Sequence, residues 1–577
     1  MHRLRLRTIS SPARRVLSTA TSTSAASGSS APGPGSSRLK KYARRAGYTG
    51  LVLGAGYFAD REFNASTVTR NLRTFYTCAI IAADYKLNFQ PGMSNEHIVA
   101  LHTRVAERLF NLLTSNGGLY IKFGQVIASN AALLPKPIQA KFSRLYDDAP
   151  QIPYSDVHNL FLSEFGRPPS GPDGMFEEFD EQAVASASIA QVHRARLWPE
   201  DRHESDSGGD GWVAVKVQKP AVAKQMEPDL LAFGAVMWMY EHWLFDMPVY
   251  FLVDFINDHL RQELDFINEA NNAKRAAAFV ATDPSLRKRV HIPHVYDALT
   301  TRRIMTAEWI DGTRLSDRDG VVALLGADGT RTLVQTMTDL FSAQIFRWGW
   351  LHCDPHPGNV LVRPGPELVL LDHGLYVHLS ETLRRQYAEL WKGMLALDLG
   401  TVRRIAGEWG IGMPEVFASA VALRPVRFQK GRTEEEEEFA KEISQYEAGV
   451  RMKKMLKGFL TDTDKMPKEL VFIGRNMRIM QSNNQLFGSP VNRIKSTGMH
   501  ASEALENAEG QSTWQKVKRG MHHGVFLGVV HGSDLVWWLR RGEMGTPGGM
   551  EDDLEKNMQQ FAKDNLGVEI NAATFEG

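Results

Sequence analysis

The sequence has few cysteines, no excess of charge of either sign and no long apolar run. Only Cys78 and Cys353 occur in 577 residues, which excludes a disulfide-stapled scaffold and a cysteine-caged zinc site. Its 67 basic and 66 acidic side chains nearly cancel, so no global field recruits nucleic acid. With 43% hydrophobic and 23% charged residues, the composition excludes a polytopic membrane protein and a wholly disordered chain, and the length indicates at least two folded units.

Acidic residues are also absent from the N-terminal region, where none precedes Asp60. A stretch that is rich in arginine and serine and free of acids is typical of a mitochondrial presequence, and we expect residues 1–45 to be a presequence followed by a linker. A disordered basic tail that binds acidic partners is the alternative. The basic residues of this stretch include Arg3, Arg5, Arg7, Arg14, Arg15, Arg38, Lys40, Lys41, Arg44 and Arg45.

Residues 46–63 contain the uncharged run AGYTGLVLGAGYF. This run is shorter than the roughly 20 residues of a straight membrane-spanning helix, so it is a candidate for a short, marginal membrane anchor. A glycine-rich buried segment is an equally good interpretation of its length.

The rest of the chain alternates between helical and strand patterns. Apolar residues recur at helical spacing from Ser94 to Ser115, and a second helix is expected from Gly118. From Met175 the pattern changes to strand-length apolar runs that predict a small antiparallel sheet, interrupted by an exposed loop over 199–211. Helices are predicted over 226–280, and a buried strand over 303–310.

The strongest chemical signal is a group of polar residues on two loops that adjoin short apolar strands. Asp354 and Asn359 are five residues apart, and Asp372 begins an Asp-His-Gly sequence. Phosphoryl transfer from ATP requires a carboxylate that orients the acceptor, and an amide and a second carboxylate that bind magnesium. The order and spacing match a kinase catalytic loop and the Asp-Phe-Gly segment. We therefore predict Asp354 as the catalytic base and Asn359 and Asp372 as the metal ligands.

Lys216 ends the apolar sequence Val-Ala-Val-Lys, which resembles the kinase strand signature Val-Ala-Ile-Lys. An ammonium at the end of a buried strand needs an anionic partner. Kinases supply it as a glutamate on the following helix, which predicts a pair between Lys216 and Glu269 and assigns both to catalysis. A solvent-exposed lysine and glutamate is the alternative.

Together these motifs resemble the UbiB-type atypical kinases, also called aarF-domain-containing kinases, and in particular the mitochondrial branch around aarF-domain kinase 1. The sequence is similar to that family over roughly 117–376, and four features carry the likeness. They are the Lys-x-Gly-Gln motif with Lys122 and Gln125, the alanine-rich nucleotide loop that includes Ala185, Ser186, Ala187 and Ser188, the Glu-x-Asp motif with Glu263 and Asp265, and the Asp-His-Gly variant.

The resemblance implies an α+β, two-lobed kinase-like fold with an N-terminal helical extension and additional C-terminal helices. We expect the helical extension over 64–150, the N-lobe over 151–310, the catalytic part of the C-lobe over 311–425 and a C-terminal helical region over 426–577. ATP and Mg²⁺ are the expected cofactors. The nucleotide contacts would come from the alanine-rich loop, from Lys216, and from Met305 and Glu308 on the strand over 303–310.

Two departures from ordinary kinases distinguish the site. Alanines and serines replace the glycines of the usual loop, which indicates a different backbone freedom around the phosphates and different nucleotide handling. In the family, the Lys-x-Gly-Gln helix closes the site against protein substrates. We therefore expect Lys122 and Gln125 to lie against Glu263 or Asp265 as a regulatory lid.

The function that the sequence favours is a mitochondrial atypical kinase or ATPase, associated with the inner membrane, that acts in coenzyme Q or other lipid homeostasis. Its expected partners are a nucleotide and a lipid or membrane surface, with no nucleic acid and no stable protein partner indicated. A conventional protein kinase is one alternative, although no Ala-Pro-Glu signature follows Asp372. A non-catalytic, nucleotide-gated scaffold is the other.

Overall fold

The computed structural model describes residues 34–129, 150–202, 210–246, 248–396, 398–412 and 462–506, together with scattered residues between and after the last two ranges. The chain divides into two compact units, Met1–Ala59 and Asp60–Gly577. Most of the predicted presequence, the segment 130–149 of the predicted extension and most of the region after 506 lie outside the described residues.

Helix α1 (Pro34–Phe63) begins inside the predicted presequence linker and contains the whole of the candidate anchor 46–63. Across the described ranges, the structure has no helix that combines the length and the apolar character needed to span a membrane.

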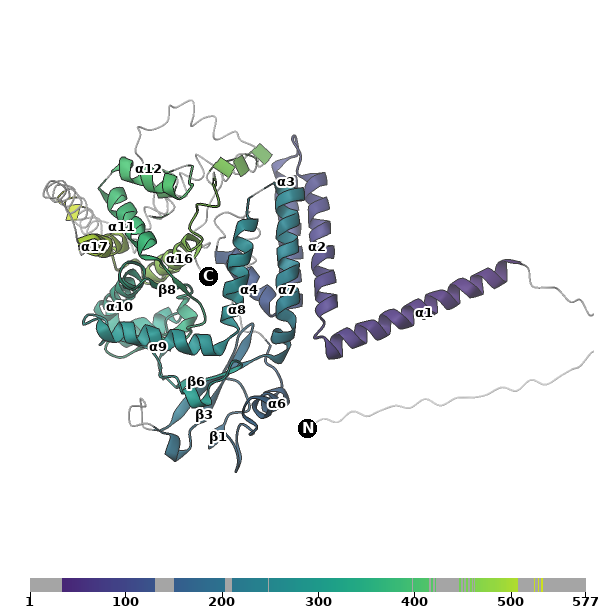
Figure 1. Cartoon of the computed structure of the whole chain (residues 1–577), viewed down its shortest axis with the longest axis horizontal. Coiled ribbons are helices and arrows are strands. Elements are labelled where there is room, and N and C mark those ends of the chain that lie inside the picture. The colour runs from purple at the N-terminus through teal and green to yellow at the C-terminus, as the bar shows by residue number, and fades with distance from the viewer. Residues whose placement is uncertain are drawn as a thin grey trace, which may run out of the picture. The chain divides into compact units, whose positions relative to one another are not determined.

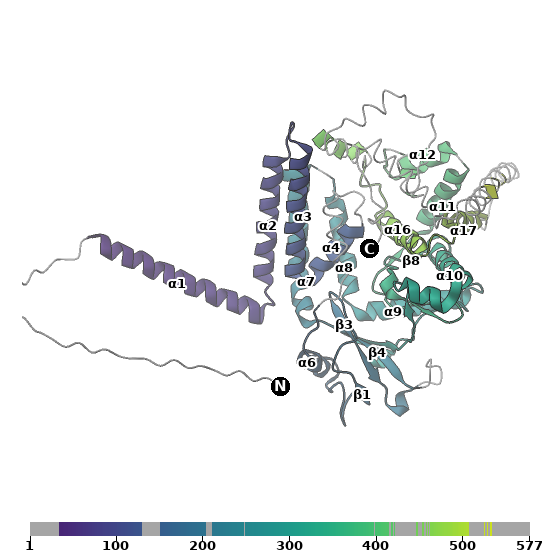
Figure 2. The ribbon, with the colours of Figure 1, turned by 180° about the vertical axis from the view of Figure 1, so that it is seen from behind.

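The helical extension consists of α2 (Thr67–Asn88), α3 (Asn95–Asn116) and α4 (Leu119–Ser129). Ser94 caps α3 by accepting a hydrogen bond from the backbone N–H of His97, which explains why the helix begins where the sequence predicts. Gly117 and Gly118 both have positive φ and turn the chain sharply from α3 into α4. Helix α2 packs against both α3 and α7 (Pro220–Met239), a helix of the N-lobe, and Figures 1 and 2 show α2 at the outer edge of this group.

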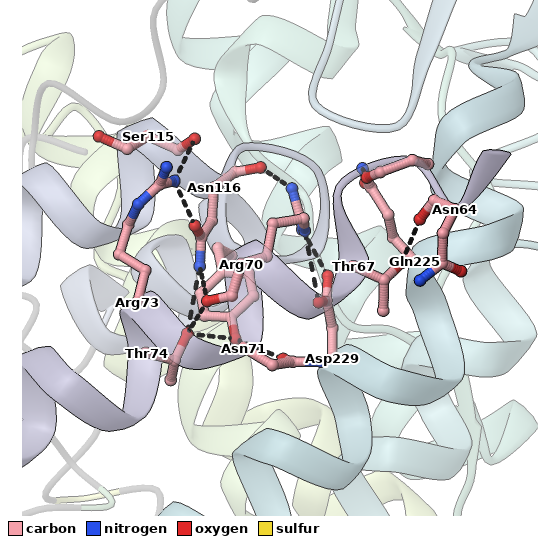
Figure 3. Close-up of polar contacts among 12 residues, drawn as sticks. Asn64, Thr67, Arg70, Asn71, Arg73, Thr74, Ser115, Asn116, Gln225 and Asp229 are labelled. Atoms are coloured by element: carbon pink, nitrogen blue, oxygen red, sulfur yellow. Dashed lines mark hydrogen bonds and ion pairs between the residues drawn. The ribbon is translucent and has the colours of Figure 1, made fainter. Parts of the chain in front are cut away.

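A buried polar cluster attaches this extension to α7 (Figure 3). Arg70 of α2 forms an ion pair with Asp229 of α7, and both side chains are almost completely buried. The same guanidinium donates to the carbonyl of Asn116 at the end of α3 and lies 5.3 Å from the ring centre of Tyr120 on α4. The Tyr120 hydroxyl is 2.6 Å from the hydroxyl of Thr74. Arg70 thus joins four helices at one point.

The N-lobe contains the predicted antiparallel sheet, with strand order β1-β3-β4-β6 and β2 beside β3. Its main strands are β3 (Ala190–Arg196), β4 (Trp212–Gln218) and β6 (Ile304–Glu308), and Lys216 of β4 stands opposite Met305 of β6. The short strands are β1 (Glu178–Phe179) and β2 (Ala185–Ser186). Helix α6 (Tyr154–Phe165) packs beside the sheet, and α7 and α8 (Val253–Glu263) lead to α9 (Phe266–Thr282).

The C-lobe is mainly helical, with short strands that carry the predicted catalytic loops. Helix α10 (Arg318–Ala343), kinked at Gly326, leads to β8 (Trp350–His352), β9 (Val360–Arg363), β10 (Glu367–Leu370) and β11 (Tyr376–His378). Strand β8 pairs with β11, while the second sheet has the order β5-β10-β9-β7, completed by β5 (Val290–His291) and β7 (Thr313–Arg314). Helices α11 (Glu381–Leu395), α12 (Leu399–Glu408), α16 (Leu470–Leu486) and α17 (Arg493–Glu506) complete the lobe.

One large apolar core joins α9 to the C-lobe helices, and a separate core lies under the N-lobe sheet. The predicted α+β, two-lobed kinase-like fold with added helices is therefore confirmed. Helix α9 belongs to the N-lobe by sequence but shares the larger core, so the two lobes are held together around it.

Candidate active site

The Lys216 ammonium on β4 is held by the Glu269 carboxylate on α9. Its Nζ atom lies 2.6 Å from Oε1 and 2.8 Å from Oε2 of Glu269, which is 1% exposed. Burial raises the pKa of Glu269, and the ammonium opposes that rise. Burial lowers the pKa of Lys216, but the carboxylates of Asp372 and Glu269 outweigh it and raise that pKa above its usual value. The lysine therefore carries its charge at neutral pH.

Asp372 and Asn359, the predicted metal ligands, lie next to each other at the same cleft. The Asn359 amide donates to Asp372 Oδ2 over 3.3 Å, and Lys216 Nζ is 3.7 Å from Asp372 Oδ1. The Gly374 N–H donates to the same Oδ1 atom at 2.9 Å. Burial raises the pKa of Asp372, but the charges of Lys216 and Lys122 prevail and hold it far below its usual range.

Asp354 follows β8, and the buried side chain of His352 holds its backbone in place. The Asp354 N–H donates to His352 Nδ1 at 3.0 Å, and His352 Nε2 is 2.9 Å from the carbonyl of Asp372. Because a carbonyl can only accept, His352 must carry its proton on Nε2 and leave Nδ1 as the acceptor. Burial lowers the pKa of His352, which favours this neutral form. The histidine thereby connects the catalytic loop to the Asp-His-Gly segment.

The alanine-rich loop leads from β2 into β3, and the side chain of a lysine holds its backbone in place. The Lys219 Nζ atom donates to the carbonyl of Ala187 at 2.7 Å and to that of Pro150 at 2.8 Å. Burial lowers the pKa of Lys219 to about 8. The Ser186 hydroxyl donates to Pro150 as well, at 3.3 Å. The loop backbone is thus fixed in place, although it lacks the usual glycines.

Met305 and Glu308 differ in their suitability as nucleotide contacts. Met305 is buried on β6 directly opposite Lys216, at the cleft. The Glu308 carboxylate lies 2.9 Å from His291 Nε2 and also accepts from the backbone N–H of His294. The Glu308 side chain therefore already has partners within the protein. Any contact between this end of β6 and the base of a nucleotide would come from the backbone.

The lid helix α4 reaches the cleft through Lys122, whose ammonium forms an ion pair with Glu263 at the end of α8. Both side chains are mostly buried, at 17% and 12% exposed. Burial lowers the pKa of Lys122, but Glu263, Asp354 and Asp372 together raise it above its usual value. The lysine therefore faces the three carboxylates that surround the acceptor side of the cleft.

The other acid of the predicted lid, Asp265, has different contacts. Asp265 caps helix α9 by accepting from the backbone N–H of Ile267 at 3.0 Å, and its other oxygen lies 3.6 Å from Arg302. Of the two acids predicted as alternative partners of the lid, Glu263 is thus the one paired with Lys122, while the Asp265 carboxylate caps the start of α9. The side chain of Gln125 lies outside the described residues.

The residues present fit a magnesium–nucleotide complex. Asn359 and Asp372 offer oxygen ligands of the kind that Mg²⁺ prefers, and phosphate oxygens and water would complete its coordination. Within the described ranges, no cluster of three or more histidine, cysteine or acidic residues could hold a metal by itself. The Ser188 hydroxyl and Asp354 Oδ1 are buried without a hydrogen-bond partner among the described residues, so each has the capacity to bind a ligand.

Three positioning contacts escaped the sequence analysis. Lys219 supports the alanine-rich loop, and Asn272 of α9 donates to the carbonyl of His373 at 3.0 Å. Arg475 of α16 forms an ion pair with Asp354 at 2.9 Å. Lys219 is close in sequence to the Val-Ala-Val-Lys strand and could have been considered. The partners of Asn272 and Arg475 are about a hundred residues away, and no local pattern indicates them.

Comparison with known proteins identifies the family. The model of the "ABC1 atypical kinase-like domain" matches residues 144–406. An ABC1 family protein of Schizosaccharomyces pombe, C10F6.14c, is 41% identical over 80% of this chain and 83% of its own length. The ABC1 family protein lscO of Purpureocillium lilacinum is 35% identical over 87% of both chains.

More distant relatives carry kinase names. AarF domain-containing protein kinase 1 of Xenopus laevis is 34% identical over 65% of this chain and 70% of its own length. Among solved structures, the Mycobacterium tuberculosis protein Rv3197, in complex with erythromycin, matches with a TM-score of 0.41 and 22% identity over 71% of this chain and 98% of that one. The identities and the coverage of the fungal relatives show that this chain belongs to the ABC1 atypical kinase-like family, the aarF-domain kinases.

Proposed function

We propose that this chain is a Mg-ATP-dependent phosphotransferase or ATPase of mitochondria, associated with the inner membrane and acting in coenzyme Q or other lipid homeostasis. The observation that carries the catalytic part is the convergence of Lys216, Glu269, Asn359 and Asp372 on one cleft, with Asp354 beside them. These are the parts that ATP-dependent phosphoryl transfer uses, in their usual order.

Each residue has a distinct role in this proposal. Lys216, fixed by Glu269, would bind the phosphates of the nucleotide, and Asn359 and Asp372 would hold Mg²⁺. The metal would neutralise the charge that develops on the phosphates. Asp354 would orient the acceptor and take its proton, because its Oδ1 atom is the carboxylate oxygen without a partner among the described residues.

The space beside Asp354 limits what the closed form can accept. The cavity there has a volume of about 40 Å³ and is bordered by the Lys122–Glu263 pair. One water requires roughly 10–15 Å³ of such volume, so the space beside Asp354 has room for a small acceptor such as water. In this state water is the acceptor that we propose, and the reaction is ATP hydrolysis. A larger acceptor would require the lid helix to move.

The same geometry disfavours a conventional protein kinase. A protein substrate would have to approach Asp354 where Lys122 of the lid helix crosses to Glu263, and both side chains are mostly buried there. A non-catalytic scaffold differs from our proposal in one measurable property. It would bind Mg-ATP without turnover.

Mitochondrial and membrane association rests on the N-terminal sequence and on the family. No acidic residue precedes Asp60, and Leu51, Val52 and Leu53 lie within an uncharged part of α1. A cleaved basic presequence followed by a membrane-proximal segment would explain both features. Fractionation of cells that express the full chain and a variant without residues 1–45 tests this point, since the truncated chain should no longer enter mitochondria.

ATP hydrolysis by the purified full-length chain, with and without liposomes, tests the catalytic proposal. We expect Mg²⁺-dependent turnover that the Asp372→Asn variant lacks, and a higher rate with liposomes if the acceptor or activator is a lipid. Binding of Mg-ATP without hydrolysis or transfer under any of these conditions would overturn the enzymatic proposal and favour the scaffold.

A further inference from the structure

Helix α16 contacts the catalytic loop at three successive points. The Asn476 side chain donates to the carbonyl of His352 at 2.7 Å, and the Asn483 side chain donates to the carbonyl of Pro355 at 3.1 Å. At the loop residue between these two carbonyls, Arg475 Nη2 lies 2.9 Å from Asp354 Oδ2. Helix α16 begins at Leu470, well beyond the region 144–406 that matches the family domain. The catalytic loop is therefore supported by a helix from outside that domain.

The ion pair gives the two carboxylate oxygens of Asp354 different environments. Oδ2 is engaged by the guanidinium, whereas Oδ1 has no hydrogen-bond partner among the described residues. Both side chains border the small cavity beside the lid. A fixed carboxylate with one free oxygen is the arrangement that a general base needs, because the free oxygen can receive the proton while the other sets the orientation.

The pair is poorly explained as a purely structural contact. Arg475 is 8% and Asp354 19% exposed, and taking two such charges out of water costs about as much as their attraction returns. The two asparagine side chains already attach α16 to the loop through neutral hydrogen bonds. Anchoring therefore does not require a guanidinium at this point.

Several other charges surround Asp354. Lys122 of α4, Glu263 of α8, His356 of the loop itself and Asp372 all lie near it. Arg475 and Lys122 lie on helices that are far apart in the sequence, and both favour the ionised carboxylate. Among the described residues, the ion pair of Asp354 is with Arg475, whereas Lys122 is paired with Glu263.

We propose that Arg475 is a positioning residue for the reaction, which fixes the orientation of Asp354 and directs its free Oδ1 atom toward the acceptor. This inference rests on the proposed function, in which Asp354 is the base. It makes the C-terminal helix α16 a part of the active site. The proposed nucleotide and metal contacts come from Lys216, Asn359 and Asp372, whereas Arg475 pairs with Asp354, so the effect of replacing Arg475 should fall on turnover and not on nucleotide affinity.

The test compares full-length Arg475→Gln, Arg475→Lys and Arg478→Gln in Mg-ATP hydrolysis, with circular dichroism and thermal unfolding as checks of the fold. Arg478 lies on the same helix and is partly buried, and burial lowers its pKa to about 10, so its replacement is the matched control for the loss of an arginine from α16. We expect Arg475→Gln to lower kcat by about 10²-fold or more, as loss of general-base action does, with the KM for ATP changed less than about threefold. Arg475→Lys should recover part of the rate, because it restores the charge.

The possible results separate the inference from the proposed function. If the wild type binds Mg-ATP but neither hydrolyses nor transfers phosphate, the proposed function fails and this inference fails with it. If the wild type is active and Arg475→Gln keeps its kcat, Arg475 is not a positioning residue although the proposed function stands. Equal losses in Arg475→Gln and Arg478→Gln, with no recovery in Arg475→Lys, would likewise overturn the inference, because they would indicate a structural role of the helix.

Discussion

Lys122 and Glu263 are 141 positions apart in the sequence and form an ion pair at the acceptor side of the cleft. Glu263 also packs against the Asp-His-Gly segment, since its Cγ atom is only 3.2 Å from where a Cβ on Gly374 would lie. The lid helix is thus connected to the predicted metal site through a single glutamate.

Removal of the lysine should therefore change how the site handles nucleotide. In Lys122→Ala, Glu263 loses its partner and the lid helix loses its tether to α8, so we expect faster nucleotide exchange and an altered Kd for Mg-ATP. Self-phosphorylation is an additional expected gain if the lid normally excludes protein acceptors. Fluorescent-nucleotide exchange and incorporation of labelled phosphate measure both effects. Lys86→Ala, an exposed lysine of α2, is the matched control, and identical behaviour of the two variants would contradict the lid role.

Asp372→Asn should remove the response to Mg-ATP and leave the fold intact. The amide keeps the size of the side chain but loses the charge that Mg²⁺ and Lys216 require. The shift in Tm on addition of Mg-ATP measures the effect. In the wild type we expect stabilisation that grows with ligand concentration, and in Asp372→Asn almost none. Asp319→Asn, at a side chain that is 92% exposed, provides the control. Undiminished stabilisation in Asp372→Asn would show that the metal site lies elsewhere.

The Arg70–Asp229 pair should be important for the attachment of the extension. Arg70→Met leaves the Asp229 carboxylate buried without its cation, and the loss of one partner of a buried pair typically costs about 3–5 kcal/mol. Replacing both residues, as Arg70→Met with Asp229→Leu, should recover much of that loss because no charge remains buried. Urea unfolding of the two single variants and the double variant measures the difference. A double variant less stable than either single one would contradict this account.

His102 should make the extension sensitive to acid. Burial lowers the pKa of His102 to about 4, below the 6.5 of an exposed histidine, and its Nδ1 atom lies 2.9 Å from the Tyr85 hydroxyl. A histidine with a lowered folded-state pKa takes up a proton on unfolding, so its favourable contribution is complete above pH 6.5 and declines as the pH falls toward 4. As the pH is lowered from 7.5 to 5, we expect the free energy of unfolding of the wild type to fall relative to that of His102→Phe. A difference that does not depend on pH would contradict the assignment.

Local sequence was sufficient to predict many of the elements. The helix that begins at Asn95 follows from its serine cap and its apolar spacing, and β4 and β6 follow from short apolar runs between loop residues. The Lys216–Glu269 contact was predicted from motif order, and the structure places the two groups within hydrogen-bond distance. The sequence left Glu263 and Asp265 as alternative partners of Lys122, and only the structure shows that Asp265 satisfies the nearest free N–H at the start of α9 while Glu263 reaches the lysine.

The sequence by itself determined the chemical groups of this protein and the order in which they occur: a basic N-terminal stretch without acids, a strand lysine, a catalytic loop and an Asp-His-Gly segment. Only the tertiary structure decided which distant groups meet them, such as Arg475 with Asp354, Asn272 with His373 and Arg70 with Asp229. The physical reason is that helix periodicity and turn chemistry act over a few residues, whereas a buried charge selects its partner by distance in space. Two helices that are far apart in sequence can supply that partner only once the core has packed.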